Sequence, residues 1–118
     1  MKKILVVDEL QALSKIYVEL LLKDFLVEAS DDPKEITPRT MRFRPHLLIV
    51  NADLPHLNAE EVCNLAKGKF QIPILLLVGK SSAKTIAIDG CHADAILTRP
   101  FDNKVLLDAV QQLIGLTS

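Results

Sequence analysis

Five short, nearly all-apolar runs recur along the chain, and helix-like segments separate them. They cover residues 3–8, 26–30, 46–50, 74–78 and 93–98. Runs without polar–apolar alternation are typical of strands buried on both faces, and they are far shorter than the roughly 20 residues of a membrane-spanning helix. Strands that alternate with helices form βαβ units. The 118-residue chain is therefore predicted to be one α/β domain, 1–118, built on a doubly wound parallel sheet.

The first two segments between these runs differ in regularity. The first carries an apolar helix face made of Leu10, Leu13, Ile16, Tyr17, Leu20 and Leu21. The second begins at Asp32 and Pro33, a typical helix start. Pro38 then lacks the backbone N–H that a helix interior needs. We therefore expect a short or broken helix after the second strand.

Capping residues mark the other three helices. Asn58 is expected to cap the third helix and Asp102 the fifth. The fourth is expected to begin at Ser81 or Ser82 and to end at Gly90. The predicted inner face of the third helix consists of Ala59, Val62, Cys63 and Ala66. That of the fifth consists of Val105, Leu106, Ala109, Val110, Leu113 and Ile114.

Composition and charge exclude several classes of function. Fourteen basic and 15 acidic residues give a net charge of −1, so the chain has no overall attraction for nucleic acid or anionic lipid. Only 4% of the residues are aromatic, which argues against a stacking surface for single-stranded nucleic acid. The apolar run after Lys3 ends at Asp8, too early for an export signal. With two widely spaced cysteines, Cys63 and Cys91, we expect a cytoplasmic protein with reduced thiols.

Acidic and polar residues follow the predicted strands, at the edge where doubly wound sheets carry their sites. Asp8 and Glu9 come directly after the first strand, and Asn51 and Asp53 follow the third. Adjacent carboxylates in such a crevice suit Mg²⁺, although acids also serve as helix caps. The loop that starts at Asp8 has no glycine, and this disfavours a phosphate cradle for a nucleotide or flavin.

Four segments carry a family resemblance. They are Lys3–Glu9 (KILVVDE), Arg44–Asn51 (RPHLLIVN) followed by Leu54-Pro55, Pro73–Val78 (PILLLV) and Ala93–Phe101 (ADAILTRPF). In this order and spacing they resemble the receiver domains of response regulators over essentially the whole chain. The resemblance implies a flavodoxin-like (βα)₅ three-layer sandwich with strand order 2-1-3-4-5. It also implies two-component phosphorelay signalling, in which an aspartate at the end of the third strand accepts a phosphoryl group beside Mg²⁺.

The resemblance carries the family's acidic pair onto Asp8 and Glu9, but the phosphoacceptor position is Asn51. A neutral amide does not attack phosphorus as a carboxylate does. Losing one carboxylate also weakens a magnesium site, so we expect weak Mg²⁺ binding at Asp8 and Glu9 or none, and no required cofactor. Asp53 is either a turn residue or a replacement carboxylate for a metal or a phosphoryl group.

Three further positions depart from the family pattern. Val78 replaces the hydroxyl residue that contacts the phosphoryl group, Arg99 replaces the lysine before proline, and Ile96 replaces the aromatic switch residue. Arg99 keeps the positive charge but as a longer planar fork. The candidate partners of its guanidinium are Asp8, Glu9 and Asp53. Several changes at phosphoryl-switch positions together predict a pocket that is no longer maintained for phosphorylation.

The sequence therefore predicts a pseudo-receiver, a signalling domain that binds proteins and is not an enzyme. Its expected partner is a histidine kinase, a downstream effector or a second copy, with no direct binding to nucleic acid or membrane. By family analogy, the interface comprises the fourth helix, fifth strand and fifth helix, with surface residues Ile86, Ile88, Lys104 and Asp108. Two alternatives remain open: a receiver still phosphorylated or metal-bound through Asp53, and a pseudo-receiver that binds a small ligand.

Overall fold

The computed structural model describes residues 1–9, 12–79 and 93–115, and it contains a five-stranded parallel sheet. The strands are β1 (Lys3–Val7), β2 (Leu26–Ser30), β3 (Leu47–Asn51), β4 (Ile74–Val78) and β5 (Ala95–Thr98). They lie in the order β2-β1-β3-β4-β5, and every neighbouring pair is parallel. The predicted doubly wound fold and its strand order are therefore confirmed.

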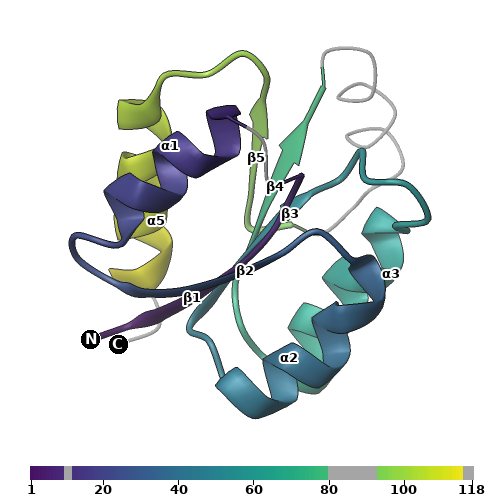
Figure 1. Cartoon of the computed structure of the whole chain (residues 1–118). Coiled ribbons are helices and arrows are strands. Elements are labelled where there is room, and N and C mark those ends of the chain that lie inside the picture. Colours follow the sequence, from purple (N-terminus) through teal and green to yellow (C-terminus); the bar gives the residue numbers. More distant parts are fainter. Residues whose placement is uncertain (10–11, 80–92, 116–118) are drawn as a thin grey trace.

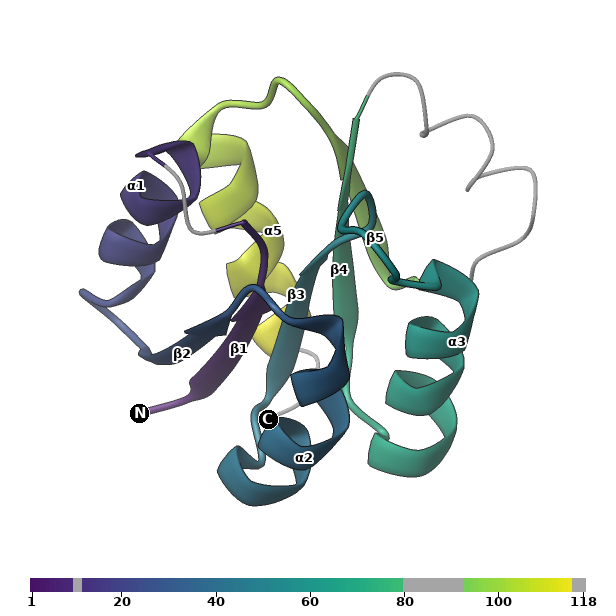
Figure 2. The ribbon, with the colours of Figure 1, turned by 45° about the vertical axis from the view of Figure 1, so that its right-hand side comes forward.

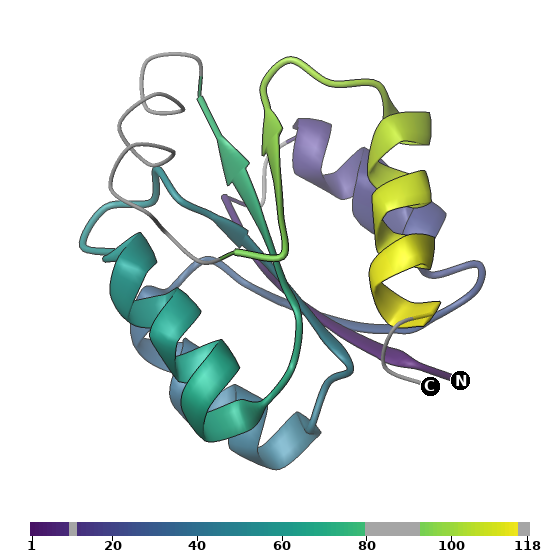
Figure 3. The ribbon, with the colours of Figure 1, turned by 180° about the vertical axis from the view of Figure 1, so that it is seen from behind.

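Helices cover both faces of the sheet. On one face lie α1 (Ala12–Leu21) and α5 (Asn103–Gly115), and on the other lie α2 (Ile36–Phe43) and α3 (Ala59–Asn64), as Figure 1 shows. A π-helical segment, Leu65–Phe70, continues α3. The same three layers are seen obliquely in Figure 2 and from behind in Figure 3. The expected fourth helix, with Ile86 and Ile88, lies outside the described residues.

Consecutive residues of the central strands point to opposite faces and build two apolar clusters. The cluster under α1 and α5 contains Ile4, Val6, Tyr17, Leu21, Phe25, Leu47, Ile49, Leu75, Leu77, Leu106, Val110, Leu113 and Ile114. The cluster under α2 and α3 contains Leu5, Val7, Ile36, Leu48, Val50, Leu54, Val62, Cys63, Ala66, Ile74, Leu76 and Val78. Burial on both sides explains why β1, β3 and β4 are apolar at nearly every position.

The strand boundaries differ from the sequence prediction by one or two residues. β3 includes Asn51, which pairs with Leu77 of β4. β5 begins at Ala95 instead of Ala93, because Asp94 closes the start of the β4–β5 pair. The Asp94 backbone N–H donates to the Ile74 carbonyl at 3.0 Å, and its Oδ2 accepts from the Ile74 N–H at 2.8 Å.

Two helix starts follow the capping signals. Oδ1 of Asn58 accepts a hydrogen bond from the Glu61 N–H at 3.0 Å, so Asn58 is confirmed as the cap of α3. Asp32 caps a 3₁₀ turn, Pro33–Glu35, which leads directly into α2. Pro38 occupies the first turn of α2, where backbone N–H groups lack a partner within the helix. The helix is therefore short, as expected, and unbroken.

Two side chains that were predicted to face the core are exposed. Ile16 of α1 and Val105 of α5 are each 46% exposed. Each precedes a buried residue, Tyr17 or Leu106, and one helical position turns a side chain by about 100°. The helices therefore present narrower apolar stripes to the sheet than the apolar spacing suggested. No helix in the described ranges is long and apolar enough to cross a membrane.

Candidate functional site at the strand ends

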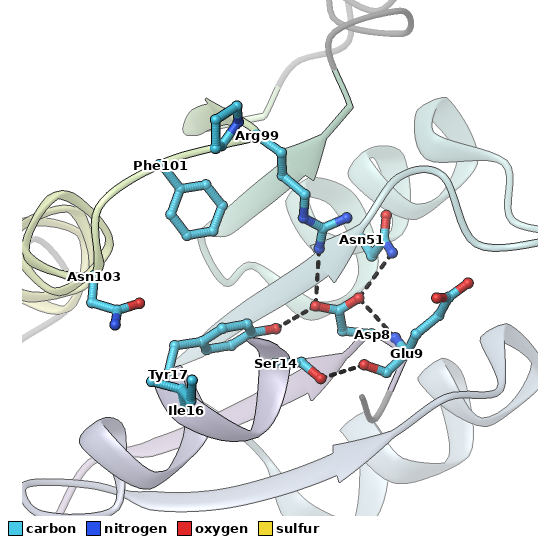
Figure 4. A pocket seen from close by; sticks show the side chains of 10 residues that line it. Asp8, Glu9, Ser14, Ile16, Tyr17, Asn51, Arg99, Phe101 and Asn103 are labelled. Carbon is cyan, nitrogen blue, oxygen red and sulfur yellow. Dashed lines mark hydrogen bonds and ion pairs between the residues drawn. The ribbon is translucent and has the colours of Figure 1, made fainter. Parts of the chain in front are cut away.

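The parallel strands bring four widely separated residues to one edge of the sheet. Asp8 follows β1, Asn51 ends β3, Val78 ends β4 and Arg99 follows β5. A cavity of about 330 Å³ opens beside them. Its walls consist of Asp8, Glu9, Ser14, Ile16, Tyr17, Asn51, Arg99, Pro100, Phe101 and Asn103. Figure 4 shows that Tyr17, Arg99 and Asn51 all point toward the Asp8 carboxylate.

The Asp8 carboxylate is buried and accepts hydrogen bonds from four donors. Its Oδ1 accepts from the Asn51 Nδ2 at 2.8 Å and from the Glu9 backbone N–H at 2.7 Å. Its Oδ2 accepts from the Tyr17 hydroxyl at 2.6 Å and from the Arg99 guanidinium at 3.0 Å. Asp8 is only 2% exposed, so these four contacts replace the water that a charged carboxylate would otherwise require.

Arg99 forms the ion pair with Asp8 that the sequence offered as one of three choices. The two side chains are 35% and 3% exposed, respectively. An uncompensated charge at the position of Asp8 would be strongly destabilising, and the guanidinium supplies the opposite charge. Arg99 itself follows β5, and its backbone N–H donates to the Val78 carbonyl at 2.8 Å, which fixes the start of its side chain.

Tyr17 joins the site although its sequence pattern predicted only a core position. It was assigned to the inner face of the first helix, where it indeed lies, 3% exposed, among the apolar residues of the sheet. Its hydroxyl, however, reaches Asp8. Burial above all, and then the Asp8 carboxylate, raise the pKa of Tyr17 far above its ordinary value, so the phenol remains a donor. The only available signal was a hydroxyl-bearing side chain in an otherwise aliphatic stripe.

Asn51 uses both ends of its side-chain amide. Its Nδ2 donates to Asp8, and its Oδ1 accepts from the Asp53 backbone N–H at 2.8 Å. A carboxylate has only acceptor oxygens and does not make both contacts. Asn51 is 4% exposed, so the loss of either contact would leave a buried polar group without a partner. The amide is therefore matched to its surroundings in a way that an ionised aspartate is not.

The remaining predicted site residues do not join the Asp8 cluster. Asp53 is exposed and turns toward the end of β4, where its Oδ2 accepts from the Gly79 N–H at 2.6 Å. Val78 is fully buried in the apolar cluster under α2 and α3. Ile96 is half-buried and packs against that same cluster. The described part of the interaction face, Lys104 and Asp108 on α5, is exposed.

The donors around Asp8 do not fit a magnesium site. A metal ligand needs a free lone pair on its oxygen, whereas each Asp8 oxygen already accepts two hydrogen bonds. Within the described ranges, no three His, Cys, Asp or Glu residues come together in a way that would hold a metal ion. The expected Mg²⁺ ligands are thus reduced to Glu9, which is exposed. In this arrangement Arg99 supplies the positive charge beside Asp8.

The chain is similar in sequence to a response regulator and to a transcriptional regulatory protein. No family model matches the chain. It is 28% identical over 117 residues to the response regulator ArlR of Staphylococcus epidermidis, covering 97% of this chain and 53% of that protein. It is equally identical to the alkaline phosphatase synthesis transcriptional regulatory protein PhoP of Bacillus subtilis, covering 96% of this chain and 48% of PhoP. The chain thus spans about half the length of these curated relatives.

Solved structures agree with the sequence relatives. A response regulator signal receiver domain from Bermanella marisrubri is 28% identical, with a TM-score of 0.82 over 95% of this chain and 97% of that chain. The receiver domain of the Francisella response regulator 1452 matches over the full length of both chains, with 20% identity and a TM-score of 0.85, and supports the fold. The sheet order and these likenesses together show that the chain is similar to the receiver domains of response regulators.

Proposed function

We propose that this receiver domain is a protein-binding module that is not switched by phosphorylation of an aspartate. The observation that carries the proposal is the buried Asp8 carboxylate, whose acceptor positions are filled by Tyr17, Arg99, Asn51 and the Glu9 backbone N–H. A site that accepts a phosphoryl group beside Mg²⁺ needs a free carboxylate for the metal. Here the chain's own groups take that place.

The chemistry at the end of β3 supports the same conclusion. Phosphoryl transfer to a side chain needs a nucleophilic oxygen, whereas the Asn51 amide is neutral and its oxygen already accepts from the Asp53 N–H. Val78 has no hydroxyl to donate to a phosphoryl oxygen, and its side chain is fully buried. We therefore assign the domain a binding function without catalytic turnover or a required cofactor.

The partner in this proposal is a protein of a cytoplasmic signalling pathway. A histidine kinase or a downstream effector is the primary candidate, and a second copy of the chain is the other. The relatives whose names specify response or transcriptional regulation support this class of partner. Lys104 and Asp108 project from the exposed side of α5 and are proposed as members of the contact face. Direct contact with nucleic acid or membrane is not part of the proposal.

The test combines NMR and intact-mass measurements on the wild-type chain. Amide resonances are recorded during titration with Mg²⁺ and then with beryllofluoride, a mimic of the phosphoryl group. A parallel sample is incubated with acetyl phosphate and Mg²⁺, and its intact mass is measured by mass spectrometry. We expect no saturable shifts at Asn51, Val78 or Arg99 and no added phosphoryl mass. A mass gain that Asp53→Asn abolishes would replace this proposal with phosphorylation at Asp53.

The cavity beside Asp8 supports one second candidate, a receiver that binds a small ligand. It measures about 330 Å³, within the range of small-molecule sites, and the Tyr17 and Phe101 rings and Ile16 line its apolar side. A ligand there would shift the Ile16 and Phe101 resonances without changing the protein's mass. Screening a fragment mixture by NMR distinguishes the two functions, because the binding-module proposal requires no occupant in this cavity.

A further inference from the structure

A carboxylate from the neighbouring loop holds the chain where it leaves β4. Gly79 is the first residue after that strand. Its backbone N–H donates to Oδ2 of Asp53, on the loop after β3, at 2.6 Å. A hydrogen bond to an ionised acceptor is shorter and stronger than a neutral one. The contact therefore ties the end of β4 to the end of β3 through one charged side chain.

Three contacts hold the loop that carries Asp53 in place. The Asp53 N–H donates to the Asn51 side chain at 2.8 Å, and the Ala52 N–H donates to the Leu77 carbonyl at 2.9 Å. Leu54 is 4% exposed in the apolar cluster under α2 and α3. Because the backbone on both sides of Asp53 is fixed, the carboxylate loses little further entropy when it binds the Gly79 N–H.

Gly79 and Asp53 fit one another sterically. A Cβ atom at position 79 would lie 3.0 Å from Oδ2 of Asp53, closer than ordinary van der Waals contact. A side chain at this position would force the carboxylate to shift by a few tenths of an ångström. The absence of a side chain on Gly79 thus favours the short contact.

The other groups at the end of β4 are also engaged. The Val78 carbonyl accepts from the Arg99 N–H at 2.8 Å, and the Val78 side chain is buried and apolar. With its N–H bound to Asp53, Gly79 has no backbone donor left for another anion. The Val78 carbonyl and the Gly79 N–H at the end of β4 are therefore both bound by groups of the same chain.

We propose that Asp53 is a built-in anionic ligand of the β4 end, which holds Gly79 in one arrangement whether or not an anion enters the site. The inference rests on the proposed function and deepens it. A domain whose strand ends are fixed by its own carboxylate presents a constant surface to its partner. Its signalling output then depends on whether the partner binds, and not on a modification of the pocket.

The test measures hydrogen exchange of single backbone amides by NMR, in buffer without phosphate or metal. Asp53→Ala is compared with Asp94→Ala, because Asp94 makes the same kind of contact with the Ile74 N–H at the other end of β4. We expect Asp53→Ala to speed exchange at Gly79 by about tenfold or more and to leave Ile74 unchanged. Asp94→Ala should do the reverse.

A double-mutant cycle provides the second readout. Gly79→Ala is expected to speed exchange at residue 79 in the otherwise native chain, because its Cβ forces the carboxylate to shift by a few tenths of an ångström and weakens the short hydrogen bond. In the Asp53→Ala background the same substitution should add no further effect. Equal Gly79 exchange with and without the Asp53 carboxylate, or additive effects of the two substitutions, would overturn the proposal.

These outcomes are distinguishable from failure of the proposed function. Phosphoryl mass on the wild-type chain would show that the pocket is still switched by phosphorylation, whatever the exchange rates are. Slow exchange at Gly79 that depends on Asp53 would establish the tie between the strands in either case. If the chain is phosphorylated and Asp53 also protects the Gly79 amide, the idea of a constant surface is refuted. If the chain is not phosphorylated and Asp53 does not protect the Gly79 amide, only the role proposed for Asp53 is refuted.

Discussion

Asp8 retains a carboxylate in a nearly water-free position because its neighbours supply both charge and donors. Arg99 provides the opposite charge at 3.0 Å, and Tyr17 and Asn51 supply neutral donors at 2.6 and 2.8 Å. In a low-dielectric interior such contacts reinforce one another, and the loss of one leaves a polar group without a partner. Substitutions in this cluster should therefore lower the free energy of unfolding.

Tyr17→Phe tests the phenol directly. The substitution preserves the ring in the apolar cluster and removes only the hydroxyl that donates to Asp8. We expect the free energy of unfolding to fall by about 1.5–3 kcal/mol, the range for a hydrogen bond to a charged group. Urea denaturation followed by circular dichroism measures it. An unchanged unfolding midpoint would mean that the phenol is dispensable to the buried carboxylate.

Asn51→Asp restores the family's phosphoacceptor and tests whether the pocket still accepts it. The new carboxylate loses the donor to Asp8 and faces a like charge, which raises its pKa in the folded state. We expect a loss of about 1–3 kcal/mol at pH 7 that shrinks as pH falls, because the protonated acid is again a donor. Asn64→Asp, on an exposed position of α3, is the matched control in urea titrations at pH 7 and pH 4.5. Equal pH dependence in both variants would contradict the expectation.

At the scale of elements, the strand starts are joined by side chains as well as by the sheet ladder. Nδ1 of His46, just before β3, accepts a hydrogen bond from the Lys3 N–H of β1 at 3.0 Å. Burial, and then the charges of Lys2 and Lys3, lower the pKa of His46. A protonated imidazole has no acceptor nitrogen, so the contact needs the neutral ring.

His46 should therefore make folding stability depend on pH. Its folded pKa lies below the unfolded value, so the unfolded chain binds the proton more readily as pH falls. The contribution is fully present above the unfolded pKa of about 6.5 and is lost as pH falls through the folded pKa. Urea unfolding at pH 7.5 and pH 5.5 should show a loss at low pH that His46→Asn reduces. His56→Asn, at an exposed histidine, should keep the wild-type loss. The reverse pattern would refute the assignment.

At the scale of the whole molecule, one sheet stabilises two apolar clusters at once. Leu76 faces the cluster under α2 and α3, whereas Leu77 faces the cluster under α1 and α5. Both side chains are fully buried. Because neighbouring residues of β4 serve opposite faces, neither cluster is separable from the strand that supports the other.

Cavities on either face should therefore destabilise the same cooperative unit. Leu76→Ala and Leu77→Ala are each expected to cost about 2–5 kcal/mol. Leu22→Ala, at a side chain that is 50% exposed, should change stability by less than about 0.5 kcal/mol. Denaturation monitored by both fluorescence of Tyr17 and circular dichroism should give one coincident transition for each variant. Separate transitions for the two faces would contradict a shared core.

Local patterns determined the elements of this protein, and the physical reason is that burial and capping act over a few residues. The apolar runs that predicted β1, β3 and β4 are buried on both faces, and Asn58 caps α3 through contacts three residues apart. Parallel strands also send their carboxyl ends to one edge, which is why Asp8, Asn51 and Arg99 were expected together. The sequence alone therefore predicts that these three residues lie at the same edge of the sheet.

The partners of the site residues were decided only by the tertiary structure. The sequence offered Arg99 three candidate acidic partners. In the structure its guanidinium contacts Asp8, which lies 91 positions away in the sequence. The packing of α1 directs the Tyr17 side chain to Asp8, and the turn after β3 directs the Asp53 side chain to Gly79. The spacing of residues along the sequence does not predict either direction. Side-chain contacts between distant segments depend on the packed geometry of the whole sheet, whereas the sequence by itself determines which segments that sheet is made of.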